Sequence, residues 1–154
     1  MAKANPETVL LKGDHFRKQR EAAGTITPGQ LLVLGTGDTV LRHATAHGWH
    51  NRWFAVENDI AGDDLDDNYA SGEVVQIQAA RPGDEIYAFL ADGQNVAIGA
   101  LLSSNGNGDL RAILADSSDV VIEPVAVAMA LEALDLSGSP LVDPASRRIK
   151  VEVL

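Results

Sequence analysis

Short apolar runs separated by turn-forming residues dominate the pattern of this chain. Residues 81–111 show it best. Apolar runs of strand length are divided there by five glycines, Gly83, Gly93, Gly99, Gly106 and Gly108. This spacing is typical of compact β proteins, because short strands need frequent tight turns. The sequence therefore predicts an all-β fold.

Continuous apolar runs and strict alternation mark the individual strands. Residues 30–34 are apolar after the first position, which predicts a fully buried strand. Residues 148–153 alternate charged and apolar side chains, as a strand with one buried face should. By the same criteria we expect further strands at residues 39–43, 53–57, 73–79 and 85–90.

Two segments are ambiguous in their periodicity. Residues 125–134 are rich in alanine, leucine and methionine, which favours a helix, but the larger side chains alternate with alanines. We predict a strand there, because the period of two persists through the segment. Residues 16–23 predict one or two helical turns that end at Gly24.

An internal similarity supports the β layout. Residues 26–32 resemble residues 96–102, and each segment leads into a Gly-Xaa-Gly-Asp turn, at 35–38 and at 106–109. Glycines in such turns supply the positive φ angles that other residues avoid. We expect two similar β-hairpins packed into one barrel-like body.

Composition and charge exclude several classes of protein. The chain has 154 residues, no cysteine and a formal net charge of −10, so disulfides and thiolate metal sites are impossible. The acidic balance disfavours a general role on nucleic acid, where cations must neutralise phosphates. No apolar run is long enough for a membrane span. The first residues lack the apolar core of a signal peptide, so we expect a product made in the cytoplasm.

The charge is unevenly distributed along the chain. The first twenty residues hold five Lys or Arg residues and two acids, whereas residues 57–73 hold seven carboxylates and neither Lys nor Arg. Solvated surface segments are the common outcome for such charge runs. We predict an N-terminal arm at residues 1–24 and a β-barrel domain at residues 25–154. The arm should be mobile, and the barrel should fold without residues 2–20.

No set of residues in the sequence completes a metal site. His43 and His47 would share one face of a helix, but no Cys or Glu completes a ligand set, which favours polar loop histidines. Residues 59–67 fail the EF-hand frame, because no glycine occupies the sixth position. Whether this acidic loop binds another ion is left open. We predict no metal site.

Signatures of catalysis are also missing. No serine lies in a Gly-Xaa-Ser-Xaa-Gly elbow, and no Gly-Lys-Ser/Thr follows the Gly-Xaa-Gly turns. We therefore predict no catalytic residue, no cofactor and no enzymatic activity. Of the two tryptophans, Trp49 lies in a polar stretch and is expected at an interface, whereas Trp53 begins an apolar run and is expected in the core.

Several segments taken together resemble the head decoration (capsid cement) proteins of tailed bacteriophages. The resemblance extends from about Thr8 to the end of the chain. Each segment is a turn-and-strand signature, and their order and number make the resemblance specific. The segments are residues 25–32, 43–46, 54–59, 81–86, 93–99, 127–133 and 148–152.

This resemblance implies a small β-barrel or β-tulip domain that binds the outer surface of an assembled capsid. Such proteins sit as oligomers, often trimers, where subunits of the major capsid protein meet, and a dimer is the other expected state. The implied location is the virion, on the capsid exterior, with no direct contact to nucleic acid or membrane. The N-terminus differs from the shorter, glycine-rich cement subfamily, so residues 12–20 are the part that the resemblance supports least.

The residues expected to contact the capsid or a neighbouring subunit lie in the arm and beside it. The apolar run should add as a strand to an exposed edge, and the cations should meet acidic groups there or the acidic loop of a neighbour. The predicted contact residues are Val9, Leu10, Leu11, Arg17, Lys18, Arg20 and Trp49.

Two alternative functions remain at this stage. A barrel-sandwich carrier would need a lysine at a hairpin tip, yet the chain has no lysine between Lys18 and Lys150. A small hydrolase accessory to capsid maturation would need a serine paired with His43 or His47.

Overall fold

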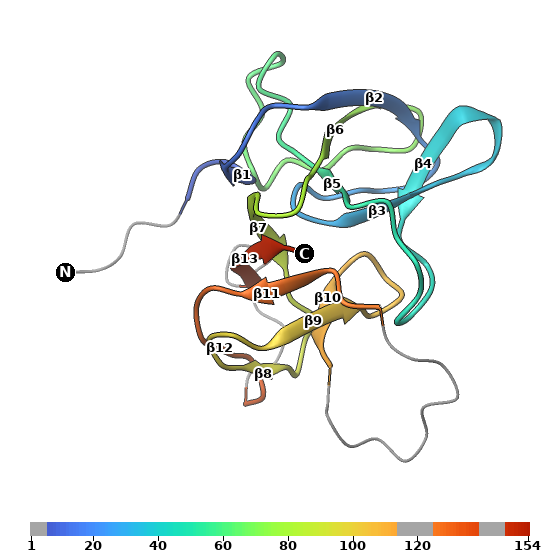
Figure 1. Ribbon diagram of the computed structural model, residues 1–154. Coiled ribbons are helices and arrows are strands. Elements are labelled where there is room, and N and C mark those ends of the chain that lie inside the picture. Colours follow the sequence, from blue (N-terminus) through green and yellow to red (C-terminus); the bar gives the residue numbers. More distant parts are fainter. Residues whose placement is uncertain (1–5, 114–124, 139–146) are drawn as a thin grey trace.

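The computed structural model describes residues 6–113, 125–138 and 147–154 (Figure 1). This part of the chain is nearly all β and contains a closed five-stranded barrel beside a six-stranded sheet. The all-β, barrel-containing fold class expected from the sequence is therefore confirmed. A short 3-10 helix, Thr36–Asp38, is the helical element of the described residues.

The closed barrel has the strand order β2-β4-β3-β5-β6. Its members are β2 (Arg17–Ala22), β3 (Leu31–Leu34), β4 (Thr39–Arg42), β5 (Trp53–Ala55) and β6 (Val74–Ala79). The β2–β4 pair is parallel and closes the barrel, while the other pairs are antiparallel. Apolar side chains such as Leu32, Val40 and Ile77 fill its interior and are fully buried.

The six-stranded sheet is antiparallel, with the order β1-β7-β13-β11-β9-β10. Its members are β1 (Leu10–Lys12), β7 (Glu85–Phe89), β13 (Arg148–Val153), β11 (Ala128–Ala130), β9 (Leu101–Ser104) and β10 (Leu110–Ala112). A two-stranded ribbon joins β8 (Asn95–Val96) to β12 (Leu134–Asp135). Figure 1 shows the barrel above the β9–β11 end of the sheet.

One large core connects the barrel to the sheet. Leu31 and Phe54 face outward from the barrel and meet Ile86 and Ile149 of the sheet, and all four side chains are fully buried. Burial of apolar area on this scale is the main stabilising force in a chain with few aromatics. The barrel therefore has its own interior core and shares a second, larger core with the sheet.

The two hairpins expected from the internal similarity both exist. β3 pairs with β4 and β9 pairs with β10, each antiparallel. They belong to different sheets, however, so the single barrel-like body that the similarity suggested is wrong in that detail.

The N-terminal segment does not behave as the expected arm. Residues 17–22 form β2, which pairs with β6 and β4 inside the barrel, so the predicted helical turns and lack of regular structure there are wrong. Residues 10–12 form β1 at the edge of the chain's own sheet. β2 could not be recognised from its polar sequence, because the apolar side chains that stabilise it belong to other strands. Residues 1–5 of the predicted arm lie outside the described residues.

The alanine-rich segment forms strands, but not one continuous strand. β11 covers Ala128–Ala130, a bend follows at residues 131–132, and β12 begins at Leu134. Ala128 and Ala130 face the core, while Met129 between them is half-buried on the outer face. Tertiary pairing with β9 and β13 thus decides against the helix that composition favours.

Candidate functional site

The apolar residues predicted to contact the capsid are largely buried within this chain. Val9 is fully buried and Leu10 is 8% exposed, both in the large core. The backbone N–H of Val9 donates to Glu57 Oε2 at 3.0 Å, and its carbonyl accepts from Tyr87 N at 2.8 Å. The predicted strand addition therefore occurs within the chain, on β7, and leaves only the half-buried Leu11 near the surface.

Basic residues of the segment predicted as an arm also contact other residues of the same chain. The Lys18 ammonium lies 5.3 Å from the centre of the Trp53 ring, in cation–π range. Arg20 Nε lies 2.8 Å from Asp38 Oδ1, although the N–H is not aligned for a hydrogen bond. Arg17 alternates to the other face of β2 and lines a cleft. These cations thus have contacts inside one chain, and their contacts with a neighbour's acidic loop stay a prediction.

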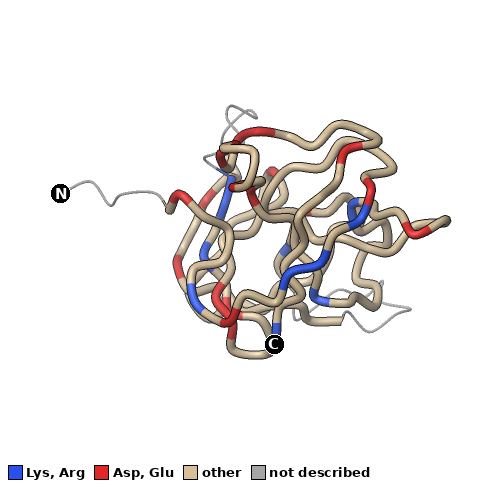
Figure 2. The backbone as a smooth tube through the Cα atoms, turned by 90° about the horizontal axis from the view of Figure 1, so that it is seen from above, with Lys and Arg blue, Asp and Glu red and all other residues tan. Residues whose placement is uncertain are grey.

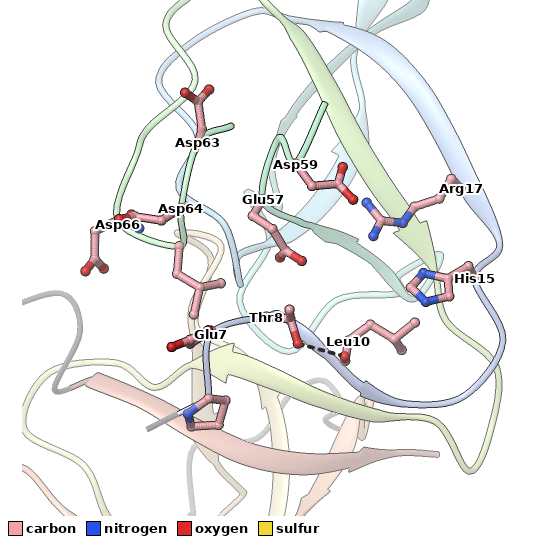
Figure 3. Close-up of a pocket in the computed structure, with 12 residues that line it drawn as sticks. Glu7, Thr8, Leu10, His15, Arg17, Glu57, Asp59, Asp63, Asp64 and Asp66 are labelled. Carbon is pink, nitrogen blue, oxygen red and sulfur yellow. Dashed lines mark hydrogen bonds between the residues drawn. The ribbon is translucent and has the colours of Figure 1, made fainter. Parts of the chain in front are cut away.

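An acidic cleft opens between the N-terminal strand, β2 and the loop that follows β5 (Figure 3). Its volume is about 620 Å³. The lining residues are Pro6, Glu7, Thr8, Leu10, His15, Arg17, Glu57, Asp59, Asp63, Asp64, Leu65 and Asp66. Six of the twelve are carboxylates, whereas Arg17 is the one Lys or Arg among them. The cleft therefore carries a concentrated negative potential.

Glu57 is the most deeply placed carboxylate of the cleft. Its side chain is 6% exposed, and Figure 3 shows it between Asp59 and Thr8. Oε2 accepts the hydrogen bond from Val9, and Oε1 has no hydrogen-bond partner among the described residues. Arg17 Nε is buried without a hydrogen-bond partner in the described part of the chain. Burial, followed by the charges of Glu57 and Asp63, raises the pKa of nearby Tyr69 to about 12.

This set of groups suits a particular ligand chemistry. Leu10 and Leu65 provide apolar walls that are 8% and 7% exposed. A group with an apolar body and an N–H donor would satisfy both these walls and the free oxygen of Glu57. Within residues 6–113, 125–138 and 147–154, no three His, Asp or Glu side chains are arranged to hold a metal ion.

A second surface is formed by the Trp49 loop, which we define as residues 43–52. Three histidines of this loop hold it against neighbouring segments. His43 Nδ1 lies 2.7 Å from Ser104 Oγ and His43 Nε2 lies 2.7 Å from the carbonyl oxygen of Trp49. His47 Nδ1 lies 2.6 Å from Ser103 Oγ, and His50 Nε2 lies 3.3 Å from the Ala126 carbonyl.

These partners fix the orientation of the buried His43 ring. A carbonyl oxygen can only accept, so His43 Nε2–H donates to Trp49, and Nδ1 lies within hydrogen-bond distance of the Ser104 hydroxyl. Burial lowers the pKa of His50, and burial followed by the charge of Arg111 lowers the pKa of His47. The neutral form of both rings is thereby favoured.

The histidine–serine pairs bear on the hydrolase alternative. Ser103 and Ser104 lie within hydrogen-bond distance of His47 and His43, as that alternative requires. Both serines are fully buried, and Ser104 Oγ also accepts from Gly106 N at 3.1 Å. A nucleophile needs space for the atom that it attacks, so this geometry favours anchoring of the loop. The two serines lie about sixty residues from these histidines in the sequence, so no local motif could have predicted the pairs.

The Trp49 loop presents its tryptophan to solvent. Trp49 is 72% exposed, as expected for an interface residue, whereas Trp53 is half-buried against the barrel core. His47 and Arg52 have φ angles of 56° and 57°, which side chains other than glycine rarely adopt. Such strained conformations persist where the surrounding contacts fix them, and they gather at functional sites.

Charge separates the two surfaces further. Residues 39–56, which include the loop, contain no Asp or Glu in a chain with a net charge of −10. Figure 2 shows Asp and Glu spread over most of the remaining backbone. Figure 1 places the connection from β4 to β5 beside the β9–β10 hairpin, away from β1 and the acidic loop. One side of the molecule thus offers a carboxylate cleft and another offers an acid-free loop with an exposed indole.

Comparison with known proteins identifies the fold. No family model and no curated protein sequence matches this chain. The structure is similar to the head fiber gp8.5 N base of bacteriophage phi29, with a TM-score of 0.56 and 11% sequence identity. The match covers 90% of this chain and 92% of the phi29 chain. In the described residues, no helix is long and apolar enough to cross a membrane.

Proposed function

We propose that this protein is a structural component of a tailed-phage virion that binds the outer surface of the head. The observation that carries the proposal is the fold likeness to the phi29 head fiber base, which extends over nearly the whole of both chains. The sequence resemblance to head decoration proteins points to the same place by a separate route. Both lines concern proteins of the phage head, and neither involves turnover.

The partner in this proposal is the major capsid protein, at junctions between its subunits. A clamp across a junction adds buried area, worth about 25 cal/mol per Å² before the costs of association are subtracted. Repetition over the lattice adds avidity without requiring a strong single contact. An oligomer, with a trimer favoured over a dimer, would bridge several subunits at once. The protein would act without cofactor, nucleic acid or membrane.

The likeness to a fiber base favours attachment as the primary role. A base must hold to the head surface, and reinforcement of the shell follows from that attachment. The carrier alternative gains no support, because Lys12, Lys18 and Lys150 lie within β1, β2 and β13 rather than at hairpin tips. The hydrolase alternative is disfavoured by the burial of both serines.

Co-sedimentation tests the proposal. Purified protein mixed with mature, expanded heads of the phage that encodes it should pellet with the heads and raise their resistance to heat. Unexpanded precursor heads should bind it poorly, because the subunit junctions change on expansion. An unrelated acidic protein of similar size serves as the control. Absence from the head pellet, or equal binding to both kinds of head, would refute the proposal.

A further inference from the structure

The Trp49 loop has the properties of a preformed binding element. Its tryptophan is 72% exposed, and the carbonyl of that residue is fixed by His43 at 2.7 Å. The backbone of His47 is held in turn by Ser104 and Val125, at 2.9 and 3.1 Å. A side chain on a fixed backbone loses little conformational freedom on docking, and tryptophan is enriched among residues that dominate interface energies.

The acidic cleft offers a hydrogen-bond acceptor and apolar residues that an exposed tryptophan side chain could contact. Glu57 is 6% exposed and lines the cleft, and its Oε1 accepts no hydrogen bond from the described residues, so this oxygen is available to a donor that enters the cleft. Leu10 and Leu65 line the same cleft, with 8% and 7% of their surfaces exposed. An indole supplies both parts, since it has a large apolar ring and a single N–H donor.

Charge complements this match. The cleft has six carboxylates, of which Asp66 is paired with Arg148 at 2.8 Å. The segment that contains the Trp49 loop has no acid and carries Arg42 and Arg52. Complementary potentials of this kind guide association and fix its register. The two surfaces lie in different places on one chain, so they can only meet between copies.

We propose that this chain associates with itself head to tail, the Trp49 loop of one copy docking in the acidic cleft of the next. The Trp49 ring packs against Leu10 and Leu65, and its Nε1–H donates to Glu57. Such a heterologous contact closes into a ring where the rotation between copies permits it. The proposal specifies the interface for the oligomer in the proposed function and does not depend on capsid binding.

Analytical ultracentrifugation of the free protein tests the contact. The wild-type chain should associate in a concentration-dependent manner across the micromolar range. Trp49→Ala should weaken this association by about 30-fold or more, and Trp49→Phe, which keeps a ring but loses the N–H, should lie between the two. Ile98→Ala removes a side chain that is 71% exposed elsewhere and serves as the control, with no expected change.

Complementation between two variants gives the decisive result. Trp49→Ala keeps an intact cleft, and the double variant Asp63→Lys, Asp64→Lys keeps an intact loop. At concentrations at which wild type associates, each alone should be largely monomeric, whereas their mixture should form a one-to-one complex and nothing larger, because one intact contact remains. Circular dichroism confirms that each variant is folded.

Three outcomes would overturn the proposal. They are a monomeric wild type throughout the range, unchanged association of either variant, and a mixture that stays monomeric. None of these would affect the head-binding proposal, which co-sedimentation tests separately. If wild type binds heads but stays monomeric in solution, the head-to-tail contact is wrong and attachment stands.

Discussion

The guanidinium of Arg148 binds the carboxylate of Asp66, with Nη1 and Oδ1 2.8 Å apart, and so ties the last strand of the sheet to the acidic loop. The Arg148 side chain is 1% exposed, whereas that of Asp66 is 58% exposed. Arg148 also donates to the carbonyls of Pro28 and Leu65, and its guanidinium lies 4.6 Å from the centre of the Phe89 ring. One buried cation thus connects the sheet, the entry to β3 and the wall of the cleft.

The first prediction concerns this contact. Arg148→Ala should lower the free energy of unfolding by about 3 kcal/mol or more, because it leaves two buried carbonyls without donors. Arg148→Lys should recover only part of the loss, since one ammonium cannot reproduce the planar fork. Asp66→Asn should cost about 1 kcal/mol or less, because that carboxylate is largely solvated. Urea unfolding measures all three, and equal losses for Arg148→Ala and Asp66→Asn would contradict the account.

The second prediction concerns Gly106, which supports the Trp49 loop. Its φ is 85°, and a Cβ there would lie 2.9 Å from the backbone N of Ala46. Gly106→Ala should therefore cost about 1–3 kcal/mol and displace the loop. Gly93 has a φ of 75° and open space around it, so Gly93→Ala should cost only the backbone strain of about 1 kcal/mol. Similar losses in thermal unfolding for both variants would show that the Ala46 contact is unimportant.

The third prediction concerns pH. Folding lowers the pKa of His47 and His50, so it favours their neutral rings. Their contribution to the free energy of unfolding is present above the unfolded pKa of about 6.5 and is lost as pH falls through the lowered values. The Trp49 loop should therefore loosen in mild acid. Trp49 fluorescence, read in a Trp53→Phe background, should change in that range.

Two variants control the pH experiment. His47→Gln with His50→Gln should abolish the change in Trp49 fluorescence, because no titrating ring then holds the loop. His15→Gln, at the distant cleft, should leave the change intact. A transition that persists in the double variant would assign it to other groups.

The fourth prediction concerns the N-terminus. Deletion of residues 2–20 should prevent folding, because it removes β1 and most of β2, and β2 closes the barrel through its pairs with β4 and β6. Deletion of residues 2–5, which spares both strands, should leave a folded protein. Circular dichroism and hydrogen exchange distinguish the two results. A folded protein without residues 2–20 would restore the arm that the sequence suggested.

Sequence periodicity predicted the strands whose own side chains define a buried face. Residues 148–153 alternate because Ile149, Val151 and Val153 face the core, and the segment forms β13 as expected. β2 escaped prediction because it is polar throughout most of its length and takes its apolar partners from β6. The basic charge of this segment therefore led to the prediction of an arm, whereas strand pairing makes it part of the barrel.

The candidate surfaces were only partly visible in the sequence. The exposure of Trp49 followed from its polar neighbours, but the serines that hold its loop come from β9, far along the chain. The acidic run was evident, yet its role as the wall of a cleft depends on Val9 and Leu10 folding back beside Glu57. Long-range contacts of this kind leave no local pattern from which they could be inferred.

Electron cryomicroscopy of phage heads incubated with the purified protein tests the central claim most directly. The account predicts added density on the outer surface, at junctions between major capsid subunits, into which the barrel and its adjoining sheet fit. Heads without the protein should lack that density. Bare junctions at saturating protein, or density confined to the head interior, would contradict a role on the head surface.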